Sequence, residues 1–142
     1  MTIEFQKEGR IGIIKINGRL DASNARELKD NFVKYLEDTI YFIMDFSELE
    51  FIDSTGLGAV ISAFKHASEV DGDVYIANLQ PKPRMVFDIT RAYRIFDVYE
   101  DVDTALEAMQ EKRNNFHLNL NEMLNIFASQ PNQVGAGFFP RD

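Results

Sequence analysis

The stretch Phe51-Ile52-Asp53-Ser54-Thr55-Gly56-Leu57-Gly58 decides how this chain folds. An apolar run typical of a strand, at 41–46, comes shortly before it. Apolar residues at helical spacing follow it over 57–70. The stretch therefore marks the point where a strand passes into a helix.

Small and polar residues dominate this junction. Ser54 and Thr55 are residue types that favour the N-cap, because a side-chain oxygen can accept a hydrogen bond from a free backbone N–H. Gly56 and Gly58 leave the first turn without side chains, so another surface can approach the backbone closely. Two interpretations stay open on spacing alone, an ordinary capped helix start and a docking point.

Composition narrows the class of protein. The 142 residues suffice for one domain with its own core, and the absence of cysteine excludes disulfides, thiol catalysis and cysteine-ligated metals. A net charge of −8 argues against nucleic acid or an anionic membrane as partner and favours a basic protein partner. No signal-peptide pattern occurs at the N-terminus, and no apolar run approaches the ~20 residues of a membrane span. We expect a cytoplasmic protein.

The remaining pattern alternates strands and helices. Strands are expected at 3–5, 11–16, 41–44, 74–77 and 95–99, and helices over about 25–36, 57–70, 84–93 and 101–110. Such alternation predicts an α/β domain with a mixed, mostly parallel sheet. The run 41–44 has almost no polar alternation, which is typical of a central strand covered on both faces.

Several helix ends have sequence signals. Asp21 and Ser23 are candidate N-caps of the first helix, and Asn17-Gly18 is expected to end the strand before it. Gly72 suits the left-handed end of the second helix. The two prolines Pro81 and Pro83 are expected to delay the third helix to about residue 84. Its predicted buried face is Val86, Ile89 and Tyr93.

Catalytic and metal chemistry are disfavoured. A nucleophilic Ser54 needs a base nearby, but twelve residues of helix put His66 roughly 18 Å away. His117 stays open as a partner for Ser54, and a serine-dependent enzyme is the alternative of another class. Four acids in 45–53 could hold a hard cation, although a solvated loop is the favoured interpretation. We expect no metal, no cofactor and no enzymatic activity.

Two motifs resemble the STAS family of bacterial anti-sigma factor antagonists. Asp53-Ser54-Thr55-Gly56-Leu57-Gly58 is similar to its phosphorylation motif, and Gly18-Arg19-Leu20-Asp21 to its earlier Gly-x-Leu-Asp element. The resemblance covers roughly residues 3–110 and implies helices packed on one side of the sheet. It implies that the unphosphorylated chain binds an anti-sigma factor that is also a serine kinase. Phosphorylation at Ser54 would break this complex, and a serine phosphatase would restore it.

The partner-binding surface expected from this resemblance combines both motifs. Its residues are Asp21, Asp53, Ser54, Thr55, Gly56, Gly58 and Ser62. Three of these, Ser54, Gly58 and Ser62, recur at i, i+4 and i+8 and share one helix face. The family's Thr-Gly-Leu element is replaced here by Thr90-Arg91-Ala92, a departure that could alter partner choice.

The tail changes character after residue 112. We predict a STAS domain at 1–111 and an extension at 112–142, with a short helix at about 119–128 and coil beyond it. Leu120, Met123, Leu124 and Phe127 keep helical spacing and could dock on the domain or on a second copy. The alternative function is a STAS scaffold or transporter-associated module that does not act on a sigma factor.

Overall fold

The computed structural model describes residues 1–128, apart from the side chains of 116–119. By its internal contacts the chain divides into two units, Met1–Glu107 and Ala108–Asp142. The predicted coil beyond residue 129 lies outside the described residues. The elements are β1 (Thr2–Glu8), β2 (Ile11–Leu20), α1 (Ala25–Tyr35), β3 (Tyr41–Asp45), β4 (Leu49–Ile52), α2 (Ser54–Glu69), β5 (Asp73–Ala77), α3 (Pro81–Thr90), a 3-10 turn η1 (Ala92–Arg94), β6 (Val98–Tyr99) and α4 (Val102–Ala128).

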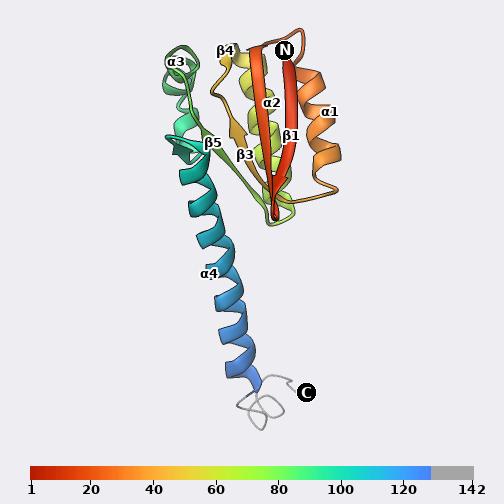
Figure 1. Ribbon diagram of the computed structural model, residues 1–142, viewed down its shortest axis with the longest axis vertical. Helices are drawn as coiled ribbons and strands as arrows, with labels where there is room; N and C mark the ends of the chain where they lie inside the picture. Colours follow the sequence, from red (N-terminus) through yellow and green to blue (C-terminus); the bar gives the residue numbers. More distant parts are fainter. Residues whose placement is uncertain (129–142) are drawn as a thin grey trace, which may run out of the picture. The chain divides into compact units, whose positions relative to one another are not determined.

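One mixed sheet organises the first unit (Figure 1). Its strand order is β1-β2-β3-β5-β6, with β4 paired to β2. Only the β1–β2 hairpin is antiparallel, and every other pair is parallel. The predicted α/β class with a mostly parallel sheet is therefore confirmed.

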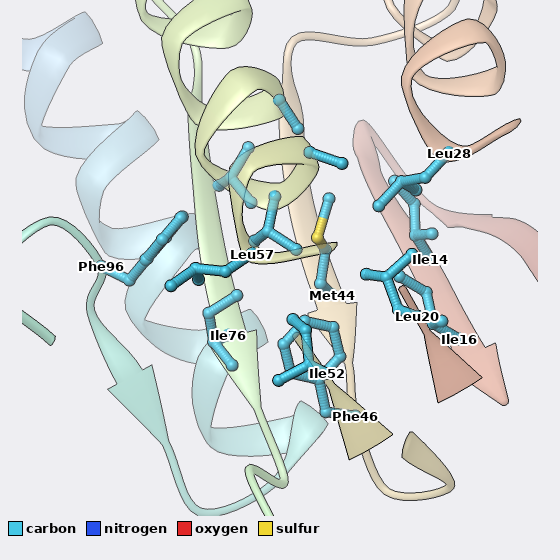
Figure 2. Close-up of a cluster of buried hydrophobic side chains, with 14 of the residues drawn as sticks. Ile14, Ile16, Leu20, Leu28, Met44, Phe46, Ile52, Leu57, Ile76 and Phe96 are labelled. Carbon is cyan, nitrogen blue, oxygen red and sulfur yellow. The ribbon is translucent and has the colours of Figure 1, made fainter. Parts of the chain in front are cut away.

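The core fills the space between the sheet and its helices. Strand residues such as Ile14, Met44 and Ile76 meet Leu28 from α1 and Leu57 from α2 (Figure 2). Their alternation along the strands points them to one face, as period-two geometry requires. The predicted double coverage of the central strand is also confirmed, since residues 42–44 are fully buried.

Strand β2 is longer than the sequence suggests. It continues through Asn17-Gly18 to Leu20 and changes partner on the way. Residues 11–15 pair with β3, whereas 18–20 pair with β4, and the register shifts between Gly18 and Arg19. Gly18 has φ +92°, a conformation that glycine adopts easily. The predicted break is therefore an irregularity inside one strand, and it directs the strand end toward β4 and the start of α2.

Two predicted helix ends were wrong. Helix α3 begins at Pro81, not near residue 84, because proline is accepted in the first turn, where its missing N–H costs no hydrogen bond. At the end of α2, Asp71 takes the left-handed conformation with φ +64°. Gly72 has a different role, since a Cβ there would lie 1.9 Å from the Ile40 carbonyl oxygen.

The predicted buried face of α3 was wrong in part, since only Val86 of its three residues packs against the core. Pro83 and Phe87 are the buried residues, whereas Ile89 and Tyr93 are exposed. Ile89 follows Phe87 by two residues, about 200° around the helix axis, and therefore faces outward. Tyr93 lies beyond the end of α3, in η1.

Helix α4 spans Val102–Ala128 without interruption. Asp101 begins it by accepting a hydrogen bond from the Thr104 backbone N–H at 2.8 Å, and this bond lowers the pKa of Asp101. The short helix expected at 119–128 is the last part of this longer helix. Among the described residues, no helix combines the length and apolar character needed to cross a membrane.

Candidate functional site

The first turn of α2 is fixed by Asp53. Its backbone is extended, and its Oδ1 accepts a hydrogen bond from the Gly56 N–H at 2.8 Å. Asp53 is thus the N-cap, and the expectation that Ser54 or Thr55 caps the helix was wrong. An aspartate serves better here because its charge also interacts favourably with the positive end of the helix dipole.

Asp53 also joins the two sequence motifs. Its second carboxylate oxygen, Oδ2, accepts a hydrogen bond from the Ala22 N–H at 3.1 Å. Its own N–H donates to the Leu20 carbonyl at 3.3 Å. Residues 20–22 are therefore held against the start of α2 by both the backbone and the side chain of one residue.

Glycine is required at position 56 because Leu20 lies against the start of α2. A Cβ at this position would lie 2.3 Å from the Leu20 carbonyl oxygen, which is far inside van der Waals contact. Gly56 is buried, whereas Gly58 is exposed and a Cβ there would meet nothing within 4 Å. Packing inside this chain explains the first glycine and gives no reason for the second.

The outward side of α2 presents small residues. Ser54, Thr55 and Gly58 are exposed, and Ser62 is half-buried. We call these four residues the α2 face. Neither the Ser54 nor the Thr55 hydroxyl bonds to the described part of the chain, so both are accessible to another molecule. Surfaces of such small residues allow close approach of a second backbone.

Asp21 shapes the turn between β2 and α1. Its Oδ1 accepts hydrogen bonds from both the hydroxyl and the backbone N–H of Ser23, and Arg19 lies 3.7 Å from its Oδ2. The Ser23 hydroxyl bond is the main reason that the pKa of Asp21 is lowered, with the Ser23 N–H second. Asp21 also adjoins Ala22, so the two motifs lie beside each other through the Asp53 hydrogen bond.

The N-cap of α1 is Asn24, which corrects the prediction for Asp21 and Ser23. Its side chain ties the turn together, accepting from the Asp21 N–H at 2.9 Å and donating to the Arg19 carbonyl at 2.8 Å. Asn24 makes no side-chain hydrogen bond to the first turn of α1, so the usual capping preference of Asn does not explain its position. Arg19 in addition covers the Phe51 ring at 4.0 Å, a contact that no spacing indicated.

Histidine-assisted catalysis gains no support at this site. Ser54 and His66 both lie on α2, and their separation by twelve residues corresponds to roughly 18 Å along the axis. His66 is exposed and lies 3.5 Å from Glu69. The side chain of His117, the other candidate base, lies outside the described residues.

Comparison with known proteins gives one family match and several similar chains. The STAS domain family matches residues 2–105. An anti-sigma F factor antagonist of Paenibacillus polymyxa is 19% identical over 112 residues, covering 78% of this chain and 96% of that protein. An anti-sigma-B factor antagonist of Bacillus subtilis is 28% identical over 85 residues, covering 60% of this chain and 78% of that protein.

Solved structures show the same fold. An anti-sigma factor antagonist from Mycobacterium paratuberculosis superposes with a TM-score of 0.70 at 21% identity, covering 77% of this chain and 93% of that one. The Bacillus cell fate determinant SpoIIAA in its phosphorylated form gives a TM-score of 0.61 at 20% identity, covering 75% and 98%.

Proposed function

The chain belongs to the STAS domain family, and on this premise we propose that it is an anti-sigma factor antagonist switched off by phosphorylation of Ser54. In its unphosphorylated form it binds an anti-sigma factor that is also a serine kinase, and so releases a sigma factor. The kinase transfers a phosphoryl group from ATP to the Ser54 hydroxyl, and a serine phosphatase removes it in the cytoplasm. The observation that carries this proposal is an exposed Ser54 on a helix start that is otherwise firmly held.

The local geometry supports a switch that leaves the fold intact. Ser54 is not the residue that caps α2, since Asp53 already accepts from Gly56 and Ala22. Modifying the Ser54 hydroxyl therefore removes no hydrogen bond within the described chain. A phosphate at this place also meets the positive end of the helix dipole, which offsets part of its charge.

The same geometry supports a large effect on binding. A phosphate adds about −1.5 to −2 charges at neutral pH, next to the carboxylate of Asp53. Placed in an interface, this charge costs several kcal/mol through desolvation or repulsion, and each 1.4 kcal/mol lowers affinity tenfold. The small residues of the α2 face leave no room for a phosphate between two closely packed surfaces.

The relatives support the same proposal. Two proteins similar to this chain are named antagonists of anti-sigma factors, and one structure of the same fold contains a phosphorylated chain. The rival function within the family is a scaffold or transporter-associated module. Such a module would use the same face for docking, and phosphorylation would not control it.

The test starts by identifying the kinase. Wild-type chain is immobilised, extract of the native cell is applied with and without ATP, and the bound protein is identified and purified. Intact mass and fragment spectra then follow the chain during incubation with that kinase and ATP. We expect one phosphate, located on Ser54, and loss of binding in the modified protein.

Variants at the two neighbouring hydroxyls make the test specific. Ser54→Ala is expected to bind the kinase persistently and to accept no phosphate, and Ser54→Asp to bind weakly. Thr55→Ala is the matched control for the site, because it removes the other exposed hydroxyl of the same turn and leaves Ser54 able to accept the phosphate. Phosphate on Thr55 alone would refute the site. A phosphorylated chain that binds undiminished, or that unfolds, would refute the mechanism.

A further inference from the structure

The last turns of α4 expose an unusual amount of apolar surface. Five large side chains are between 45% and 66% exposed: Leu120, Met123, Leu124, Ile126 and Phe127. Four of them follow one line along the helix, at i, i+3, i+4 and i+7. We call these four, Leu120, Met123, Leu124 and Phe127, the α4 stripe.

The α4 stripe has the spacing of a coiled-coil seam. Leu120, Met123 and Phe127 are separated by three and four residues, which corresponds to positions a, d and a of a heptad. Leu124 and Ile126 take the flanking positions e and g. Such a seam is self-complementary, because the knobs of one helix fit the holes of an identical one.

Charge favours a second copy as the occupant. Residues 114–128 contain a single charged side chain, Glu122, although the whole chain has a net charge of −8. In the heptad Glu122 falls at position c, away from the seam. Two of these segments can therefore pair without the repulsion that acidic surfaces would cause, and they offer no charge pattern that would select a different partner.

The apolar area fits a weak dimer. Each of the five side chains exposes roughly 100 Å², so a pair of helices would bury on the order of 1,000 Å² in total. This lies at the low end for specific interfaces. The five asparagines at 114, 115, 119, 121 and 125 are poor helix formers, so part of the binding free energy goes into ordering the helix.

We propose that residues 114–128 of α4 pair with the same segment of a second copy, giving a two-helix coiled-coil homodimer with a micromolar dissociation constant. The segment shares no residue with the α2 face, and the proposed pairing does not depend on the proposed function. It adds a self-association surface formed entirely by the chain's own C-terminal helix.

Sedimentation velocity on the full chain, from about 1 to about 300 μM, tests the pairing. The wild-type protein is expected to pass from monomer to dimer across this range. Leu120→Glu/Met123→Glu places two charges in the seam and is expected to raise the dissociation constant by about 100-fold or more. Asn121→Glu/Asn125→Glu adds the same charge at the outer positions b and f and is expected to dimerise like the wild type.

Hydrogen exchange over residues 118–128 gives an answer that does not depend on variants folding. Protection that rises with protein concentration supports pairing between copies. Protection that is the same at all concentrations would mean that the stripe docks within its own chain, and would overturn the proposal. A wild-type chain that stays monomeric, no protection at any concentration, or equal loss of dimer in both double variants would overturn it as well.

Discussion

The inward and outward sides of the first turn of α2 obey different constraints. On the inward side, Asp53 and Gly56 are fixed by contacts within the chain, to Ala22 and to the Leu20 carbonyl. On the outward side, Ser54 and Gly58 have no such contacts in the described structure. The inward pair therefore builds the site, whereas the outward pair is available for interactions with other molecules.

The two glycines make this difference measurable. They lie two residues apart in one helix, yet one has a backbone carbonyl against it and the other has open space. Glycine in an exposed helix position is destabilising relative to alanine by roughly 0.5–1 kcal/mol. Gly58 therefore lowers the stability of the isolated chain, which is understandable if a partner backbone must come close.

The largest loss of stability is expected for Gly56→Ala. The added methyl group would overlap the Leu20 carbonyl oxygen, and backbone cannot move as freely as a side chain. We expect a loss of about 3 kcal/mol or more in the free energy of unfolding, as for severe overpacking. Urea unfolding measures it. A loss below about 1 kcal/mol would mean that α2 shifts easily from Leu20, and the contrast between the two glycines would fail.

The second-largest loss of stability is expected for Asp53→Ala. This change removes the cap of Gly56 and the hydrogen bond from Ala22, and we expect a loss of roughly 2 kcal/mol. Asp53→Asn is the matched control of equal size. The single carbonyl oxygen of Asn can keep the hydrogen bond from Gly56, but its amide group then faces the Ala22 N–H. The stability of Asp53→Asn is therefore expected to lie between those of the wild type and Asp53→Ala. If Asp53→Asn is as stable as the wild type, the hydrogen bond from Ala22 contributes little to the free energy of unfolding.

The sequence predicted most elements of this fold better than their ends, but it missed strand β4 at Leu49–Ile52, directly before α2. Alternation along the strands and the apolar run at 41–44 identified the sheet, because burial controls residue type there directly. Caps were harder, since Ser54, Thr55 and Asp53 are all suitable residue types in adjacent positions. Asp53 is selected as the cap because residues 20–22 fold against it and bond to both its backbone and its side chain.

Other features of the site needed contacts that spacing cannot reveal. Gly56 and Gly58 look equivalent in the sequence, and the Leu20 carbonyl alone distinguishes them. Both motifs were recognised, and their proximity was expected from the resemblance. The side chain that joins them, and the role of Asn24, depend on loop geometry with no periodic signal.

A smaller effect, of opposite sign, is expected for Gly58→Ala. With open space around the new methyl group, the helix should gain about 0.5–1 kcal/mol in stability. Binding of the anti-sigma partner should weaken, because the methyl group separates the two surfaces. Thermal unfolding and a titration with the purified partner check both parts. Gain of stability with unchanged affinity would place Gly58 outside the interface.

The smallest change in stability is expected for Asp21→Asn. Asn can still accept from the Ser23 N–H through its carbonyl oxygen, while the attraction to Arg19 is lost. The native pKa of Asp21 is lowered from 3.8, so its carboxylate stabilises the fold above that pH and loses this effect as the pH falls through the native value. The small difference between wild type and variant should therefore be constant near neutral pH and disappear in acid. Urea unfolding at several pH values measures it.

Partner affinity is the sharper readout for the same variant. If Asp21 adds its charge to the partner-binding surface beside the α2 face, Asp21→Asn should weaken binding by roughly 3- to 10-fold, since a charge at the rim of an interface acts mainly on association. Ser23→Ala is the control, because it removes the hydroxyl bond to Asp21 but leaves the carboxylate charge in place. Weaker binding in Asp21→Asn alone assigns the effect to charge. Unchanged affinity would limit Asp21 to shaping the turn that holds Ala22 against Asp53, and the outward surface would then be confined to α2.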